Sequence, residues 1–174
     1  MKQYILSDLF TLIPEELYTP QLGKEALCNQ FNLKQEEYNF RECKLAGINA
    51  VMAYALHTQQ KLSGTDIYPF AVKLIEECNT ISQYNKVVFH FSNAQRLSHT
   101  IIATGGELKI ANSFKADSFE SALYFLFLSI QQLQMNPRQC IVRVCSPLTG
   151  KQEETIARFF SGVEKNNLDN HLQL

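Results

Sequence analysis

The sequence predicts a mixed α/β (α+β) fold, in which helices pack on a sheet. Three observations between residues 86 and 160 predict it. Three runs of β-branched and aromatic residues are separated by turns, one long amphipathic helix follows them, and a further strand and helix come last. A three-stranded antiparallel meander followed by a β-α-β connection implies a mixed sheet with helices on its faces.

The meander is predicted at residues 87–91, 97–104 and 108–114. The first two runs are rich in apolar residues, and the third alternates apolar and polar residues, as a strand with one buried face does. Gly105-Gly106 joins the second run to the third. This pair suits a two-residue type I′ hairpin, because both central residues of that turn need positive φ.

The long helix is predicted to begin at Asp117 and to end at Asn136-Pro137. Asp117 can act as the N-cap, and Glu120 completes a pair that resembles a capping box. The apolar residues that follow recur at the helical period, which is typical of a helix packed on a core. Phe125 and Leu128 widen that stripe, so we expect the helix to contact more than one neighbour. Proline cannot continue a helix and restricts the residue before it, which explains the stop.

Beyond this helix, residues 140–145 read as a buried strand and residues 153–160 as a second amphipathic helix, with a short last strand near Val163. Cys140 and Cys145 are five residues apart, so on one strand they point to opposite faces. The element order β-β-β-α-β-α is that of the ribonuclease-H-like unit. Element order alone carries no information about catalysis.

The first 80 residues predict shorter elements. They are a strand at 9–13, a helix from Thr19-Pro20, strands at 38–43 and 48–56, a short helix at 57–63, and a helix from Tyr68-Pro69 to Asn79. Proline at the first helical position after a threonine N-cap is a good helix start. We place a boundary near residues 64–66, which divides the chain into residues 1–65 and the ribonuclease-H-like residues 66–174.

Composition and charge exclude several classes of protein. The chain has 174 residues, is 45% hydrophobic and carries a net charge of −1. Its Lys and Arg residues are scattered, which argues against a nucleic-acid binder, since that would need a basic face. The apolar run of the long helix is too short to insert into a bilayer, and we see no signal peptide. Five cysteines without a C-x-x-C motif predict reduced thiols in a cytoplasmic protein, with no disulfide framework or zinc site.

Three stretches together resemble a known family: residues 10–18, residues 106–114, and the helix beginning Ser118-Phe119. In order and spacing they are similar to an uncharacterised bacterial family, best known from Bacteroides, catalogued as domain of unknown function 3822. The resemblance implies an actin-like ATPase fold, akin to the cytoplasmic pilus-assembly actin homologues. Members of that family are longer and begin with the meander of a first lobe.

Against that family, the chain starts late in the first lobe, at the strand 9–13. The resemblance therefore implies that residues 1–65 are a remnant of the first lobe and that residues 66–174 are the second lobe. An activity that needs a cleft between two full lobes is then not expected of this chain.

Actin-like ATPases hold phosphates with glycine-bearing hairpin turns, because backbone N–H groups must approach the phosphate closely. In the second lobe this turn would be residues 91–96, with Ser92, Asn93 and Gln95 as candidates for contact with a nucleotide. The turn contains no Gly and no Asp, and the chain has no Walker-type P-loop. We therefore expect no catalytic residues and no cofactor.

His90 and His99 form the most suggestive pair of side chains. If Ala94-Gln95 is a two-residue turn, His90 lies opposite His99, close enough to share a metal ion. Asn112 could lie opposite His99 on the next strand, but amides bind zinc poorly, so a third ligand is not evident. Two histidines on a partly exposed sheet face are the simpler interpretation, and we expect no metal there.

Two functional hypotheses follow. The first is a non-catalytic scaffold or interaction protein, since unpaired strand edges invite pairing with a protein partner or a second copy. The alternative is a nucleotide-binding actin-like ATPase that acts with a further lobe or a partner.

Overall fold

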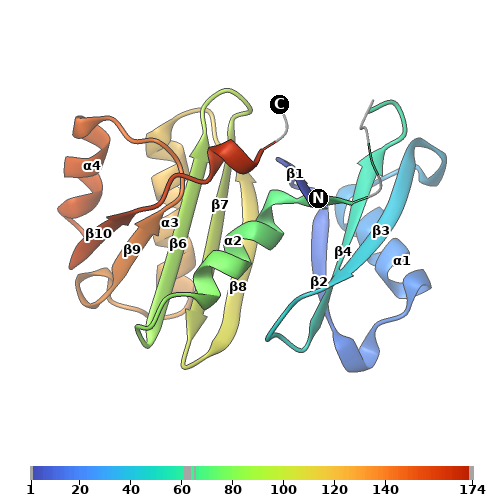
Figure 1. Ribbon diagram of the computed structural model, residues 1–174, viewed down its shortest axis with the longest axis horizontal. Coiled ribbons are helices and arrows are strands. Elements are labelled where there is room, and N and C mark those ends of the chain that lie inside the picture. Colours follow the sequence, from blue (N-terminus) through green and yellow to red (C-terminus); the bar gives the residue numbers. More distant parts are fainter. Residues whose placement is uncertain (1, 61–63, 65, 173–174) are drawn as a thin grey trace.

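The computed structural model describes residues 2–60, 64 and 66–172, and it stacks helices and sheets in five layers (Figure 1). Helix α1 (Pro20–Phe31) covers a three-stranded sheet, and helix α2 (Phe70–Asn79) separates that sheet from a five-stranded one. Helices α3 (Phe119–Gln132) and α4 (Gly150–Ala157) cover the far face of the five-stranded sheet.

The five-stranded sheet has the strand order β10-β9-β6-β7-β8. Its strands are β6 (Asn85–Ser92), β7 (Leu97–Thr104), β8 (Glu107–Lys115), β9 (Ile141–Val144) and β10 (Gly162–Lys165). Strands β6, β7 and β8 pair antiparallel, whereas β9 runs parallel to both β6 and β10. The predicted meander and the predicted mixed sheet are both confirmed.

Successive side chains of β6 point to opposite faces of the sheet, so the strand contributes to two parts of the core. Val87, Phe89 and Phe91 pack with α3, whereas Val88 packs on the side of α2, where Phe70 lies against His90. Two buried cysteines that flank β9 likewise lie on opposite faces of the sheet. Cys140 belongs to the core under α3 and Cys145 to the core around α2, as their spacing predicts.

The hairpin between β7 and β8 has the predicted two-residue loop. Gly105 and Gly106 have φ of +60° and +84°, and Thr104 pairs with Glu107. Three residues into β8 the register shifts, because Leu108 faces Ala103 while the next pair is Ile110 with Ile102. Lys109 is therefore the extra residue of a β-bulge.

Helix α3 starts at a different cap from the predicted one. Ser118, not Asp117, is the N-cap, and its Oγ accepts a hydrogen bond from the Ser121 N–H. Asp117 instead extends into solvent and pairs with Arg96. The helix ends at Gln132, before the predicted stop at Asn136-Pro137. Two residues after its end, Gln134 takes a φ of +54°.

Helix α4 begins at Gly150, three residues before its predicted start. Thr149 and Gln152 form a full capping box there, which is a stronger start signal than the first apolar residues. The predicted strand near Val163 is confirmed as β10.

The N-terminal sheet has the order β2-β4-β3, formed by β2 (Phe10–Pro14), β3 (Tyr38–Lys44) and β4 (Ala50–His57). The predicted cap of α1 is confirmed, since the Thr19 side chain accepts from the Leu22 N–H. The predicted helix at 57–63 is not formed at His57, which ends β4, and residues 61–63 lie outside the described residues.

Two short parallel strands, β1 (Gln3–Ile5) and β5 (Ile67–Pro69), were not predicted. Three residues are too few to show a periodic pattern. The 3-10 helices are Glu15–Leu17, Gln35–Glu37, Pro137–Gln139 and Asp169–His171. A bridge between Tyr4 and Leu172 brings the two ends of the described chain together beside α2 (Figure 1).

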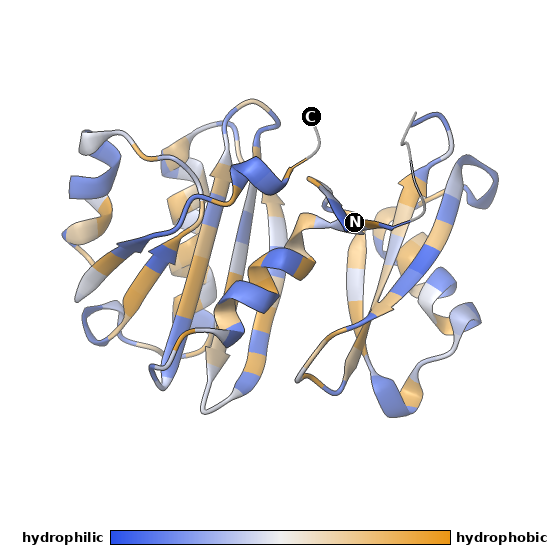
Figure 2. Cartoon of the chain, in the orientation of Figure 1, coloured by the Kyte–Doolittle hydropathy of each residue, from blue (hydrophilic) through white to orange (hydrophobic). Residues whose placement is uncertain are grey.

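The two main sheets share one core. Residues of β4, such as Met52 and Tyr54, belong to the same buried cluster as Val88 and Ile101 of the larger sheet, with α2 between them. Figure 2 shows β4 and β6 as mostly apolar along their length and α4 as mostly polar. Within the described part of the chain, no helix has the length and apolarity needed to cross a membrane.

Candidate functional site

A groove of about 610 Å³ lies where β6 and β9 end. Its walls come from the turn after β6, the loop between β9 and α4, the first turns of α3 and α4, and Asp169 of the 3-10 helix that follows β10. In open α/β sheets, ligands bind at the carboxyl ends of strands, so this is the most informative site in the molecule. Ser92 and Asn93, both predicted candidates, line the groove, whereas Gln95 lines a separate pocket beside Arg96.

The turn after β6 is closed by its own side chains. It spans residues 93–96, since Ser92 pairs with Leu97 as the last pair of the ladder, so the predicted two-residue turn at Ala94-Gln95 is wrong, although the predicted register is kept. The Ser92 hydroxyl donates to the side-chain oxygen of Gln95, and Arg96 takes a φ of +50°. Two of the three predicted phosphate-turn residues therefore bind each other, and the turn holds no glycine that would let a phosphate approach the backbone.

The two helices that point at the groove are capped by side chains of the protein. Ser118 caps α3. At α4, the Thr149 N–H donates to Gln152 Oε1 over 2.9 Å, and the Gln152 N–H donates to Thr149 Oγ1 over 3.3 Å. An anion at a helix N-terminus is held by free backbone N–H groups. Here some of those N–H groups already donate to capping side chains of the protein.

The groove is acidic. Asp117, Glu120 and Asp169 line it, and among its described lining residues none is Lys, Arg or His. Arg96 lies close by and pairs with Asp117 over 3.5 Å, and both side chains are exposed. Phe91 and Phe119, with ring centroids 6.1 Å apart, contribute to the apolar part of the lining together with Ala94 and Pro147.

Asp169 is held in place by a buried histidine. The Nε2–H of His90 donates to Asp169 Oδ1 over 2.9 Å, and the His90 ring has no exposed surface. Phe70 of α2 lies edge-on to His90, with ring centroids 4.8 Å apart. Sequence reasoning did not find Asp169, because 79 residues separate it from His90 and no local pattern links them.

The predicted pairing of His90 with His99 is confirmed by the register, and their ring centroids are 5.6 Å apart. The prediction that the two histidines lie on a partly exposed sheet face is wrong, because α2 covers the sheet there and neither histidine is exposed. Asn112 lies opposite Thr100 instead of His99, since the bulge at Lys109 moves the ladder by one residue.

By distance and angle, neither ring nitrogen of His99 completes a hydrogen bond among the described residues, although the Ser7 backbone interacts with the ring and slightly opposes the lowering of its pKa. Burial, reinforced by the neighbouring His90, lowers the pKa of His99 to about 3, so its imidazole is neutral at neutral pH. The described residues contain no group of three or more His, Cys, Asp or Glu side chains that could hold a metal ion.

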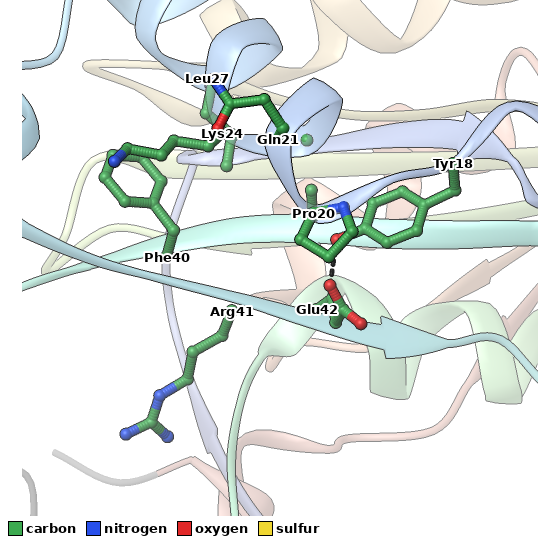
Figure 3. A pocket seen from close by; sticks show the side chains of 10 residues that line it. Tyr18, Pro20, Gln21, Lys24, Leu27, Phe40, Arg41 and Glu42 are labelled. Atoms are coloured by element: carbon green, nitrogen blue, oxygen red, sulfur yellow. Dashed lines mark hydrogen bonds between the residues drawn. The ribbon is translucent and has the colours of Figure 1, made fainter.

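A smaller hollow of about 220 Å³ lies between α1 and β3 (Figure 3). The Tyr18 hydroxyl donates to Glu42 across it, and Lys24 lies over the Phe40 ring at 5.5 Å. Gly23 permits this close packing, because a Cβ there would lie 3.1 Å from the Ala53 Cβ. These lining side chains contact one another between α1 and β3, so the hollow is part of the contact between helix and sheet.

The model of the family DUF3822, described as a protein of unknown function, matches residues 4–160. The chain belongs to the DUF3822 family. The predicted family resemblance is thereby confirmed. No curated protein matches this DUF3822 chain.

One solved structure identifies the fold of this DUF3822 protein. A Bacteroides thetaiotaomicron protein of unknown function with an actin-like ATPase fold superimposes with a TM-score of 0.80 at 20% identity, covering 96% of this chain and 70% of that one. The actin-like ATPase fold predicted from the sequence is therefore shown. A PilM–PilN type IV pilus biogenesis complex is less similar, with a TM-score of 0.45, 12% identity, and coverage of 98% and 71%.

Proposed function

We propose that this DUF3822 protein is a non-catalytic scaffold or interaction protein, built on an actin-like ATPase fold whose phosphate turn has degenerated. The observation that carries the proposal is the turn after β6. It lacks glycine, it is closed by the bond between Ser92 and Gln95, and it faces a groove lined by three carboxylates. A triphosphate needs accessible backbone N–H groups and positive charge, and this groove offers little of either.

The outer face of α3 supports a role in protein association. Tyr124 and Leu128, one turn apart, are 62% and 45% exposed. Phe125 stacks on Phe114 of β8 with ring centroids 4.7 Å apart, which extends the apolar surface onto the sheet. Glu120 is the only charge on α3. A helix that carries apolar residues on its solvent side favours contact with a second surface.

The β8 edge lies beside this surface and supports the same role. β8 has nine residues and pairs only with β7 in the described sheet, so one row of its backbone groups faces outward. The bulge at Lys109 distorts the start of the strand and leaves residues 110–115 as its regular part. We propose that a protein partner or a second copy covers α3 and this edge.

The experiment is sedimentation velocity on the purified chain from micromolar to millimolar concentration. We expect self-association, and we expect the double variant Tyr124→Ser/Leu128→Ser to be monomeric with unchanged secondary structure. The matched control is Leu17→Ser, which removes a 60% exposed leucine from a different face and should leave association unchanged. A strict monomer at all concentrations would contradict association with a second copy.

The alternative function is nucleotide binding by an actin-like ATPase that acts with a further lobe or a partner. The position of the groove, at the carboxyl ends of β6 and β9, favours it. It is tested by thermal unfolding in millimolar ATP with Mg²⁺, because a ligand present at 100 times its Kd stabilises a fold by about 2.7 kcal/mol. We expect no change in Tm, and a saturable rise would overturn the main proposal.

We further propose that residues 1–65 are the remnant of a first lobe and residues 66–174 the second lobe. The five-stranded sheet, which lies wholly within residues 85–165, supports this division. We also propose a cytoplasmic location. The five cysteines are all free, as a reducing compartment requires.

A further inference from the structure

We infer that the groove at the carboxyl ends of β6 and β9 receives an arginine side chain of a protein partner. The inference rests on the proposed function, since it names the chemistry of one partner contact. It also gives a use to a groove that is poorly built for phosphate.

The charges of the groove differ from those of the whole chain. The chain carries 16 basic and 17 acidic residues, which nearly cancel. The described lining residues of the groove include three carboxylates and no basic side chain. Arg96 pairs with Asp117 at the rim, which leaves Glu120 and Asp169 without a Lys or Arg partner among the described contacts. A cation is the occupant that complements this surface.

One of these carboxylates is held in a fixed position. Asp169 Oδ1 accepts from His90 Nε2–H. His90 lies on β6, is fully buried, and packs edge-on against Phe70. A carboxylate fixed in this way loses little side-chain entropy when it binds a cation, so it contributes more than a freely rotating surface carboxylate would.

The apolar lining suits the same occupant. Phe91 and Phe119 line the groove with the small part of each residue that is exposed, 9% and 6%, and Pro147 also lines it. Arginine carries a long apolar stem behind its charge, and its guanidinium also stacks on aromatic faces. The side-chain amide of Asn93 also lines the groove and offers an oxygen acceptor to a guanidinium. A volume of about 610 Å³ admits one such side chain with its flanking backbone.

The test uses N-acetyl-arginine methylamide as the probe, followed by amide chemical shifts of the full chain. The matched probe is the citrulline analogue, which has the same shape and no charge. We expect the arginine probe, and not the citrulline probe, to shift the amides of Asn93, Glu120 and Thr149 saturably. In the variant Glu120→Gln the affinity should fall about fivefold, as for loss of one exposed ion pair. Glu36→Gln, an exposed carboxylate on another surface, should leave it unchanged.

The outcomes separate the inference from the proposed function. Equal shifts with both probes, shifts confined to other surfaces, no shifts at all, or an affinity unaffected by Glu120→Gln would overturn the inference. If the same titration with ATP and Mg²⁺ gives no shifts, the non-catalytic proposal stands whichever result the arginine probe gives. If ATP with Mg²⁺ shifts the groove amides saturably and the arginine probe does not, both are overturned.

Discussion

His90 and His99 lie directly opposite each other on β6 and β7, and neither ring has any exposed surface. Their ring centroids are 5.6 Å apart, and Phe70 of α2 contacts both rings edge-on. His90 donates to Asp169, whereas neither ring nitrogen of His99 completes a hydrogen bond among the described residues. A buried imidazole without a hydrogen-bond partner carries charge only at a high cost in free energy, which makes His99 sensitive to pH.

Acid should destabilise the fold through His99. Burial lowers its pKa in the folded state to about 3, while in the unfolded chain the ordinary value is near 6.5. Between those values the unfolded state binds a proton that the folded state does not, so the free energy of unfolding falls as the pH falls below 6.5. Urea unfolding at intervals from pH 7 to pH 4 measures this loss.

The variant His99→Leu should flatten that pH dependence, since the unfolded chain then has one proton fewer to bind. His57→Gln removes a half-buried histidine at the end of β4 and serves as the control. A slope in His99→Leu as steep as that of the unchanged protein would contradict the assignment to His99.

Asp169→Asn should reduce stability by about 1–2 kcal/mol, because it replaces a charge-assisted bond to a fully buried imidazole with a weaker one. Urea unfolding at pH 7 measures the change. Asp117→Asn is the matched control, since its side chain is 86% exposed and, among the described residues, forms an ion pair with the exposed Arg96 alone, so a change within about 0.5 kcal/mol is expected. Equal effects of the two substitutions would argue against the buried bond.

Most of the fold could be predicted because its signals are local. The Gly105-Gly106 turn, the Thr19 cap and the alternation of the meander each depend on neighbouring residues, and each is confirmed. The misplaced cap of α3 was also a local choice, between Asp117 and Ser118. Only the backbone angles decide it, since Ser118 has the extended φ and ψ of an N-cap.

The candidate site was harder to predict because it is assembled from distant segments. The register of His90 with His99 followed from one hairpin, and Ser92 and Asn93 followed from the family resemblance applied to its turn, so sequence reasoning reached them. The bond from His90 to Asp169 depends on how residues 166–172 cross the end of the sheet, and no periodicity encodes that path. The burial of both histidines depends likewise on α2 packing over them.

Gly105→Ala should cost about 1–2 kcal/mol, because an L-residue with a side chain is strained at a φ of +60°. The added Cβ would also lie 3.1 Å from the Tyr84 hydroxyl. Gly150→Ala is the matched control at the start of α4, where the space is open and φ is not positive, so it should be neutral or slightly stabilising. Thermal and urea unfolding measure the stability of both variants. If Gly105→Ala is as stable as Gly150→Ala, the type I′ geometry is refuted.

The buried and exposed faces of α3 should respond differently to substitution. Leu126 is fully buried under the five-stranded sheet, and Leu128, two residues on, is 45% exposed. Leu126→Ala should cost about 2–5 kcal/mol through lost burial and a cavity, whereas Leu128→Ala should change the stability of the monomer by less than about 0.5 kcal/mol.

Unfolding at two protein concentrations makes this comparison a test of association as well. In a chain that pairs through α3, the stability of the unchanged protein rises with concentration, because only the folded state associates. Leu126→Ala should keep that dependence and Leu128→Ala should weaken it. If both variants keep it equally, the outer face of α3 is not the contact, and the β8 edge alone would have to provide it.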